Sequence, residues 1–349
     1  MRLACVLALA LLLTACSTTR YYYQIAHGHL SLLASAEPVE DVIVSADPEV
    51  ATALHLVQRA RAFASAELGL TFNDSYTRYV DLERDYVVQN LYAAPEFSTE
   101  LHSWCYWIIG CANYRGFFDA QMLRTARERF TAQGYDTYIA TVTAYSTLGW
   151  FDDPILSTFI GLPEYRLVGL VFHELAHQQL YVEGDTFFNE SFAMTVERAG
   201  LERFYQGDRS QLAAYGQYLS RVNAFTTLAI DTRASLETLY RQRIAPEEMR
   251  RRKAGLLAQA AEDYRALTGR EDAVFNNASL GAVAAYNKYV GAFEAMLAAG
   301  GGDLPRLYAL AEHLGSLAPA AREACLARWL EAGSGAATAL PTACRLGPK

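Results

Sequence analysis

The stretch VFHELAHQQLYVEGDTFFNESF, residues 171–192, contains His173 and His177 with Glu174 between them. Apolar residues at helical intervals around the histidines predict a helix, and an Asn-Glu pair at 189–190 follows one short loop later. On a helix, residues four apart return to nearly the same face, with Cβ atoms about 6 Å apart. The two imidazole rings can therefore bind one metal ion at nitrogen–metal distances of about 2.1 Å.

Glu174 lies beside this pair of histidines, because it projects about 100° around the helix from His173. From there its carboxylate does not bind the metal but can accept a proton from a water molecule that the metal activates. The HExxH pattern of residues 173–177 thus predicts a hydrolytic metal site. The alternative is an inert pair of helices whose histidines hydrogen-bond to the backbone or to water.

A catalytic zinc site needs a third protein ligand and an open fourth position. The longer pattern HExxHxxGxxH is excluded, because Leu180 and Glu183 occupy the positions of its glycine and third histidine. Glu190 is the preferred third ligand, since two antiparallel helices joined by a short loop can share one metal. Glu183 and Asp185 stay open as alternatives if the first helix ends abruptly. Asn189 is either the N-cap of the second helix or a contact to the substrate backbone beside the metal.

The first sixteen residues, MRLACVLALALLLTAC, are typical of an export signal. Arg2 supplies the positive charge, and residues 6–13 form an apolar run too short to span a bilayer. Residues 13–16 resemble the lipobox of bacterial lipoproteins, which implies cleavage after residue 15 and lipidation of Cys16. Ser17 then implies sorting to the outer membrane, so we expect a cell-envelope protein anchored on its periplasmic face. An ordinary cleaved signal is the alternative.

Residues 16–349 are long enough for a well-buried core, and no repeat or low-complexity linker divides them, so we expect one domain. The whole chain carries a formal net charge of −8. This acidic balance argues against nucleic-acid binding and against electrostatic docking to anionic lipid.

Cysteine usage agrees with export. Four cysteines remain after the signal segment: Cys105, Cys111, Cys325 and Cys344. An even number in an oxidising compartment suggests disulfides, although four cysteines allow three pairings. We favour Cys105–Cys111, which closes the loop CYWIIGC, and Cys325–Cys344, which holds the C-terminal segment. Four free buried thiols are the alternative, and a zinc site is disfavoured because neither pair has CxxC spacing.

Helical patterning dominates the rest of the chain, and Ala-rich amphipathic segments recur throughout. Helices are expected at residues 48–67, 118–133, 189–205, 208–244, 246–268, 277–299, 303–315 and 319–332. The stretch TYIATVTAY, residues 137–145, is rich in β-branched and aromatic residues and predicts a strand. We therefore expect a mainly α fold (α+β) with a small sheet and a C-terminal half of long helices.

Several blocks of the chain resemble one bacterial family. They are YYYQIAHGHLSLL, APEFS, WCYWIIGC, YRGFFD, AYSTLGWFDDPILSTF, FHELAHQQLYV, FNESFA and NNASLGAVAAYNKYVGAFEAML. Through them the chain, from about Tyr21 to Leu297, is similar to the bacterial putative zinc aminopeptidase family, which includes lipoproteins. One departure is Trp107, which stands where the family commonly has a proline.

The resemblance implies a zincin-like metallopeptidase with a small sheet packed near the HExxH helix. It implies one zinc ion bound by His173, His177 and Glu190, with Glu174 as the general base in the hydrolysis of a peptide substrate, as an aminopeptidase. The alternatives are a zinc hydrolase of cell-wall peptide amides and a structural lipoprotein without catalysis.

Further roles can be assigned to residues around such a centre. Tyr286 is a candidate donor to the oxyanion, with a core tyrosine as the alternative. Tyr145 is expected in an edge strand that pairs with the substrate backbone. Glu197, seven positions after Glu190, shares its helix face and either holds a ligand histidine or pairs at the surface. The Asp pair at 152–153 either caps the next helix or binds a substrate ammonium group.

Overall fold

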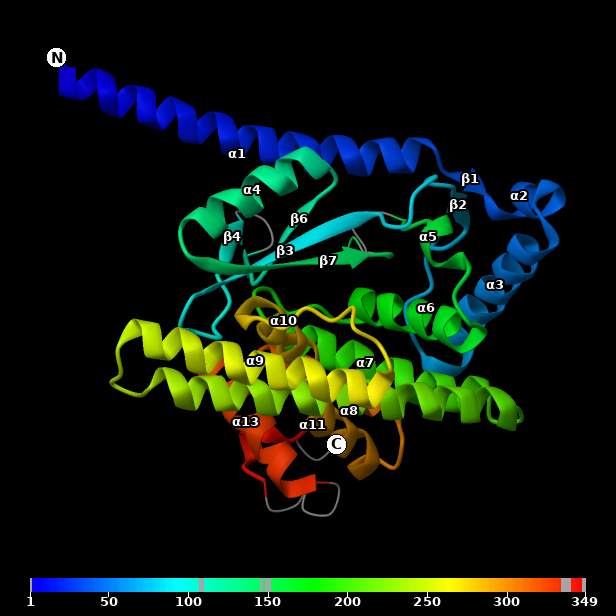
Figure 1. Cartoon of the computed structure of the whole chain (residues 1–349). Helices are drawn as coiled ribbons and strands as arrows, with labels where there is room; N and C mark the ends of the chain where they lie inside the picture. Colours follow the sequence, from blue (N-terminus) through cyan, green and yellow to red (C-terminus); the bar gives the residue numbers. More distant parts are fainter. Residues whose placement is uncertain (1, 107–109, 145–146, 148–151, 334–339, 347–349) are drawn as a thin grey trace.

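Figure 1 shows the computed structural model of the chain. It describes the backbone alone for residues 2–17 and 285–287, and the backbone and side chains of residues 18–106, 110–144, 147, 152–284, 288–333 and 340–346. Within these residues helices dominate, and the strands form small sheets. The mainly α fold that the sequence predicts is confirmed.

Three helices pack together at the centre: α3 (Pro48–Leu68), α6 (Glu164–Gln179) and α7 (Thr186–Phe204). Gly200 of α7 permits their close approach, because a Cβ atom there would lie only 2.7 Å from Cδ2 of Phe172. Phe172 is fully buried, and burial of such a side chain contributes about 1.5–3 kcal/mol to folding. The helix that carries the two histidines is therefore held in a close-packed core.

The largest sheet lies above α6 and α7 in Figure 1. Its order is β6 (Arg115–Phe117), β3 (Val88–Pro95) and β7 (Tyr135–Val142), with both outer strands antiparallel to β3. Helix α4 (Ala120–Ala132) packs on one face of the sheet and α10 (Asn277–Asn287) on the other. Helix α10 thus lies against both this sheet and α7, and β7 is an edge strand of the sheet.

Two predicted elements differ from the structure. The strand predicted at 137–145 is β7, which ends at Val142, and Tyr145 lies outside the described residues. The helix predicted at 277–299 is divided into α10 and α11 (Val290–Ala299). The division has a local cause: the backbone N–H of Tyr289 donates to Oγ of Ser191 at 3.1 Å, which takes that N–H out of any helical ladder.

The remaining strands form two smaller sheets: β1 (Glu37–Pro38), β2 (Arg78–Val80) and β8 (Ile155–Leu156) in one, and β4 (Trp104–Tyr106) and β5 (Gly110–Ala112) in the other. The short helices next to the first of these sheets are α2 (Val39–Ser45) and α5 (Ser157–Ile160). Strands β2 and β8 are parallel, so the segments that precede them lie side by side. There, the N–H of Tyr76 donates to the carbonyl oxygen of Asp153 at 2.7 Å.

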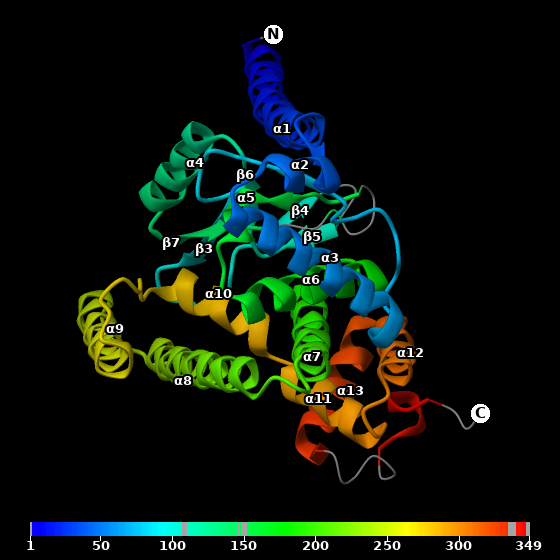
Figure 2. The same cartoon turned by 90° about the vertical axis from the view of Figure 1, so that its right-hand side faces the viewer.

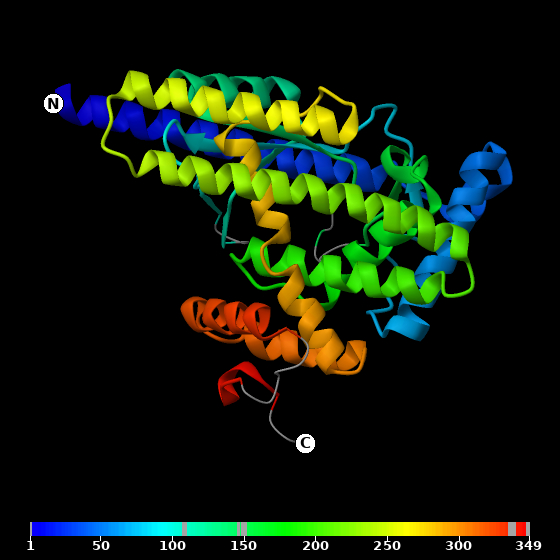
Figure 3. The ribbon, with the colours of Figure 1, turned by 60° about the horizontal axis from the view of Figure 1, so that its bottom comes forward.

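The C-terminal half is helical, as predicted. Its elements are α8 (Arg209–Tyr240), α9 (Pro246–Thr268), α12 (Leu304–Gly315), α13 (Pro319–Ala332) and the 3-10 helix η3 (Thr342–Cys344), besides α10 and α11. Figure 3 shows α8 and α9 as a long antiparallel hairpin. Lys253 fastens this hairpin to the main sheet, because its buried ammonium group lies 2.7 Å from a carboxylate oxygen of Asp136 on β7.

Both cysteine pairs form disulfides. Cys105 is bonded to Cys111 across the β4–β5 hairpin, and Cys325 of α13 is bonded to Cys344 of η3. This is the pairing favoured among the three that the sequence allows. The hairpin is closed by the first bond, and the C-terminal segment is held to the body by the second.

The N-terminal helix α1 (Arg2–Ala34) contains both the apolar run and Cys16, whose side chain lies outside the described part. Figures 1 and 2 show its first half projecting from the body while its second half lies along it. Within the described residues, we find no helix with the combined length and hydropathy of a membrane span.

Candidate metal centre

The two helices that carry the site run antiparallel through a tight connection. Helix α6 ends at Gln179, where the backbone of Leu180 becomes extended, and Gly184 adopts a positive φ of 75° that favours glycine. Asp185 then begins α7 as its N-cap, since its carboxylate accepts a hydrogen bond from the N–H of Phe188 at 3.0 Å. The chain reverses, and the second turn of α7 faces the last turns of α6.

This reversal brings three ligand atoms together. Nε2 of His173 lies 3.2 Å from Nε2 of His177 and 3.3 Å from Oε2 of Glu190, and the remaining edge, from His177 to Glu190, is 3.7 Å. A tetrahedral ion with ligand distances of about 2.1 Å would hold its ligand atoms about 3.4 Å apart. The three edges fit that spacing, so these residues form a group able to bind a divalent metal ion.

Glu197 completes the surroundings of His173. Its Oε2 lies 3.1 Å from Nδ1 of His173, so Nδ1 can donate a hydrogen bond to this carboxylate while Nε2 faces the ligand group. Gly169, one turn before His173, makes room for this carboxylate, because a Cβ atom there would lie 3.0 Å from Oε1 of Glu197. The histidine is thus oriented from behind by an acidic side chain of the neighbouring helix.

The charges of the group stabilise one another. Burial alone would lower the pKa of His173, but hydrogen bonds to the carboxylates of Glu190 and Glu197 raise it well above its ordinary value. Burial raises the pKa of Glu190, yet the neighbouring His177 and His173 lower it to about 2. Two imidazoles and a carboxylate that face one another at a largely buried position are a donor set that zinc prefers.

Glu174 lies beside the ligand group without belonging to it. The residue is only 8% exposed, and burial raises the pKa of its carboxyl group. The carboxylates of Glu190 and Asp153 act in the same direction, and the two histidines act against it. A buried carboxyl with a raised pKa is suited to general-base chemistry near neutral pH.

Tyr76 is a residue that the sequence did not point to. It is 3% exposed, and its phenolic oxygen is buried without a hydrogen-bond partner among the described residues. Its φ of 63° lies in the left-handed region, where a bulky residue is strained. Burial, together with the carboxylates of Glu174 and Asp153, raises the pKa of this phenol well above its ordinary value. Tyr76 is therefore placed close to the candidate base.

A polar network holds the segment before Tyr76 against the end of α6. Gln178, next to His177, lies at its centre: its amide oxygen accepts from Nδ2 of Asn73 at 2.7 Å, and its amide nitrogen donates to Oγ of Ser75 at 3.1 Å. The same nitrogen lies 3.2 Å from the Asp153 carboxylate, which also accepts from the backbone N–H of Thr147. Asp153 does not cap α5, because the N-cap of that helix is Leu156 and no side chain caps it.

Several predicted residues have other roles. Asn189 lies inside α7 instead of capping it, and it is 2% exposed. Its amide oxygen accepts a hydrogen bond from the backbone N–H of Val182, and its amide nitrogen donates one to the carbonyl oxygen of Val182, both at 2.8 Å. The side chain therefore stabilises the connection between the helices instead of contacting a substrate. Asp185, an alternative ligand, is the N-cap of α7, and its carboxylate also accepts a hydrogen bond from Nε of Arg322 at 2.8 Å. Glu183 is exposed.

The side chains of two predicted site residues, and of Trp107, lie outside the described part of the chain. Tyr145 and Trp107 lie outside the described residues, and Tyr286 is described only by its backbone, which lies in α10. The contacts of α10 with both α7 and the main sheet put that helix next to the candidate centre.

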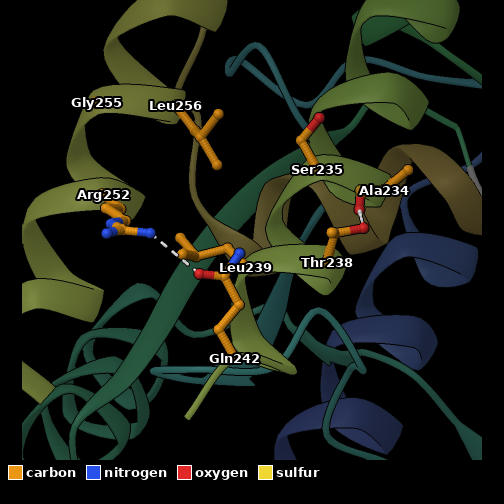
Figure 4. Close-up of a pocket in the computed structure, with 8 residues that line it drawn as sticks. All are labelled: Ala234, Ser235, Thr238, Leu239, Gln242, Arg252, Gly255 and Leu256. Atoms are coloured by element: carbon orange, nitrogen blue, oxygen red, sulfur yellow. Dashed lines mark hydrogen bonds between the residues drawn. The ribbon is translucent and has the colours of Figure 1, made fainter. Parts of the chain in front are cut away.

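A surface groove of about 670 Å³ lies elsewhere, between α8 and α9, and Figure 4 shows its lining. It is lined by Ala234, Ser235, Thr238, Leu239, Gln242, Arg252, Gly255 and Leu256. The polar contact across it joins Nη1 of Arg252 to Oε1 of Gln242 at 3.1 Å. None of its residues belongs to the metal group, and it offers no pair of groups for acid–base or nucleophilic chemistry.

A comparison with protein families gives an independent assignment. A family model described as "Putative aminopeptidase" matches residues 20–326, which includes the whole metal group. The chain belongs to this family. No curated protein and no solved structure matches the chain. Membership indicates peptidase activity, and the ligand group of α6 and α7 is the place in the structure where that chemistry fits.

Proposed function

We propose that the protein is a zinc-dependent peptidase, acting as an aminopeptidase, with a zincin-like arrangement of its site helices. The observation that carries the proposal is the ligand group itself: His173, His177 and Glu190 present three atoms with the spacing of a tetrahedral ion. Three protein ligands leave a fourth position for a small molecule, which is the pattern of catalytic rather than structural zinc.

His173, His177 and Glu190 would hold the zinc ion, which would supply Lewis acidity toward a water molecule and the scissile carbonyl. Glu174 takes the proton of the attacking water and delivers it to the leaving amine. Glu197 keeps His173 in the tautomer whose Nε2 can donate a lone pair. As predicted from the sequence, Tyr286 is assigned as the oxyanion donor, and the segment around Tyr145 as the edge that aligns the substrate backbone.

Replacing Glu174 by Gln tests the proposal. The variant should keep one zinc per chain, measured by elemental analysis, while peptide hydrolysis falls by about 10²–10⁴-fold because the base is lost. Glu183→Gln is the matched control, since it neutralises an exposed carboxylate of the connection between α6 and α7 and should keep both zinc and activity. Hydrolysis by Glu174→Gln at the wild-type rate, or a wild-type chain that binds no zinc, would refute the mechanism.

The substrate class is tested by a digest of peptides with free and acetylated N-termini, with and without chelator. An aminopeptidase should cleave the free peptides one residue at a time and reject the acetylated ones. Cell-wall stem peptides belong in the same digest, because their selective cleavage would favour a wall hydrolase.

We also propose that the chain is exported and anchored through lipid on Cys16, on the periplasmic face of the outer membrane. The proposal is supported by the charged and apolar start of the chain and by the lipobox-like residues 13–16. Mass spectrometry of the N-terminal peptide from membranes should find Cys16 as the first residue and acylated.

A further inference from the structure

The chain from the anchor to the body has no linker. Helix α1 continues unbroken from Cys16 to Tyr21, where docking on the body begins. Tyr21 is 5% exposed, with its ring 5.8 Å from that of Phe117 and the guanidinium carbon of Arg115 3.8 Å from its centroid. Five helical residues rise by about 7.5 Å. A lipid on Cys16 would therefore hold the body directly against the bilayer.

The rest of α1 is fastened to the body as well. The amide oxygen of Gln24 accepts from the backbone N–H of Phe118 at 2.9 Å and of Asp119 at 3.3 Å, just before α4. Gly28 lies so close to the ring of Phe118 that a Cβ atom there would be 2.4 Å from it. Helix α1 can therefore not swing freely, and the anchor sets the orientation of the body as well as its position.

The fold gathers positive charge at this end of the molecule. Helix α1 contains no Asp or Glu in a chain that has 38, and Arg20 is exposed on it. Helix α4 adds the exposed residues Arg124, Arg127 and Arg129 against a single acid, Glu128. In the described part of the chain, none of these four arginines forms an ion pair with a carboxylate. The basic cluster is invisible in the sequence because about a hundred residues separate its two halves.

Exposed amphipathic side chains accompany the charges. On α1, Tyr23 is 66% exposed and Tyr22 is 41% exposed. Leu30, seven residues after Tyr23 and therefore on nearly the same face of the helix, is 58% exposed. Tyrosine is the kind of side chain that lies at a membrane–water interface, with its ring among the acyl chains and its hydroxyl among the headgroups. Figures 1 and 2 show α1 and α4 at the same end of the molecule, opposite the C-terminus.

We propose that the exposed sides of α1, from Arg20 to Leu30, and of α4 form a membrane-docking face whose partner is a bilayer containing anionic phospholipid. The inference rests on the proposed lipidation of Cys16 and not on the peptidase chemistry. It differs from the expectation drawn from the net charge, because the net charge does not describe how the charges are distributed over the surface. The metal-centre helices lie on the far side of the main sheet from this face (Figure 1).

The test uses the lipidated protein, with its acylation verified by mass spectrometry, reconstituted into phosphatidylethanolamine–phosphatidylglycerol vesicles. Single cysteines at Ala26 of α1 and Thr125 of α4 carry a fluorophore, and Ala309→Cys on α12, at the opposite end, is the matched control; all three positions are exposed. A water-soluble collisional quencher should be several-fold less effective at Ala26→Cys and Thr125→Cys in vesicles than in detergent. At Ala309→Cys its effect should not change.

A second variant separates charge from tethering. Replacing Arg124, Arg127 and Arg129 together by Gln, at exposed positions where folding is not at risk, should restore quenching of the Thr125 label. Phosphatidylcholine vesicles should do the same for the unaltered arginines, because the anionic partner is then missing. Labels at Ala26 and Thr125 that stay as accessible as the Ala309 label overturn the docking face while the anchor stands. A chain without lipid overturns the anchor and this inference together, and neither result touches the peptidase proposal.

Discussion

Replacing Glu197 by Gln isolates the part of the site that orients a ligand without binding the metal. In the wild type, Oε2 of Glu197 lies 3.1 Å from Nδ1 of His173. The glutamine side chain has the same size, and its amide oxygen can still accept a hydrogen bond from Nδ1. The negative charge is lost, and with it the increase in basicity that a carboxylate gives to a ligand histidine. We therefore expect a weaker zinc site with an intact fold.

The size of the effect follows from the exposure of the pair. Loss of such a carboxylate typically costs 10–100-fold in metal affinity. The Glu197 side chain is 23% exposed, against 15% for His173, so water screens part of the interaction. We expect the lower part of the range, about 10–30-fold, which corresponds to about 1.4–2 kcal/mol.

Zinc affinity is measured by competition with a chelating dye, and the thermal stability of the metal-free protein is measured alongside. Glu202→Gln, an exposed acid on the same helix, is the matched control and should bind zinc like the wild type. Glu190→Gln, which removes a ligand, should lose far more affinity than Glu197→Gln. Equal affinities for Glu197→Gln and Glu202→Gln would refute the orienting role, and a loss as large as that of Glu190→Gln would make Glu197 a ligand.

Three further outcomes follow from the structure. The pKa of Glu190 is lowered from 4.5 to about 2 in the folded chain, so its carboxylate stabilises the metal-free protein above pH 4.5 by an amount on the order of 3 kcal/mol. This stabilisation is lost as the pH falls through 2. When denaturation is measured at stepped pH, the stabilities of the wild type and of Glu190→Gln should therefore converge in acid. Gly200→Ala should lower the stability of the protein by about 1–3 kcal/mol through overpacking. Gly216→Ala, at an exposed position of α8 with open space around it, should raise the stability by up to about 1 kcal/mol. Equal unfolding midpoints of the two variants in urea would contradict the packing argument. Tyr76→Phe removes a buried hydroxyl without a hydrogen-bond partner among the described residues and should not destabilise the protein. Tyr308→Phe breaks a buried hydrogen bond of 2.9 Å to the carbonyl oxygen of Leu68 and should lower the stability by about 1–2 kcal/mol. A larger loss of stability for Tyr76→Phe than for Tyr308→Phe would show that the Tyr76 hydroxyl has a hydrogen-bond partner.

The parts of the site that could be predicted from sequence are those governed by local geometry. His173 and His177 meet because they are one helical turn apart, and Glu190 meets them because a short connection returns the chain beside its own helix. Glu197 could be predicted because it follows Glu190 by two turns. Each of these inferences needs only the helical period and one chain reversal.

What could not be predicted depends on contacts between distant segments. Tyr76 precedes the HExxH helix by about a hundred residues, and it reaches Glu174 only through the pairing of β2 with β8 and the bonds to Gln178. The break between α10 and α11 depends on Ser191, a partner that no periodicity in 277–299 reveals. Asn189 was misread because its sequence position fits a cap, whereas the helix begins one turn earlier at Asp185.

The position of His173, His177 and Glu190 within the fold suits a catalytic role for a metal bound by them better than a structural role. His173 and Glu190 each keep 15% of their side chains exposed, while the apolar face behind them, with Phe172 and Phe192, is fully buried. The helix pair is therefore held together by its core, close-packed at Gly200, and does not need an ion to form. A metal bound at the open edge of such a preformed pair can accept and release substrate without endangering the fold, which is what hydrolysis requires and structural zinc does not.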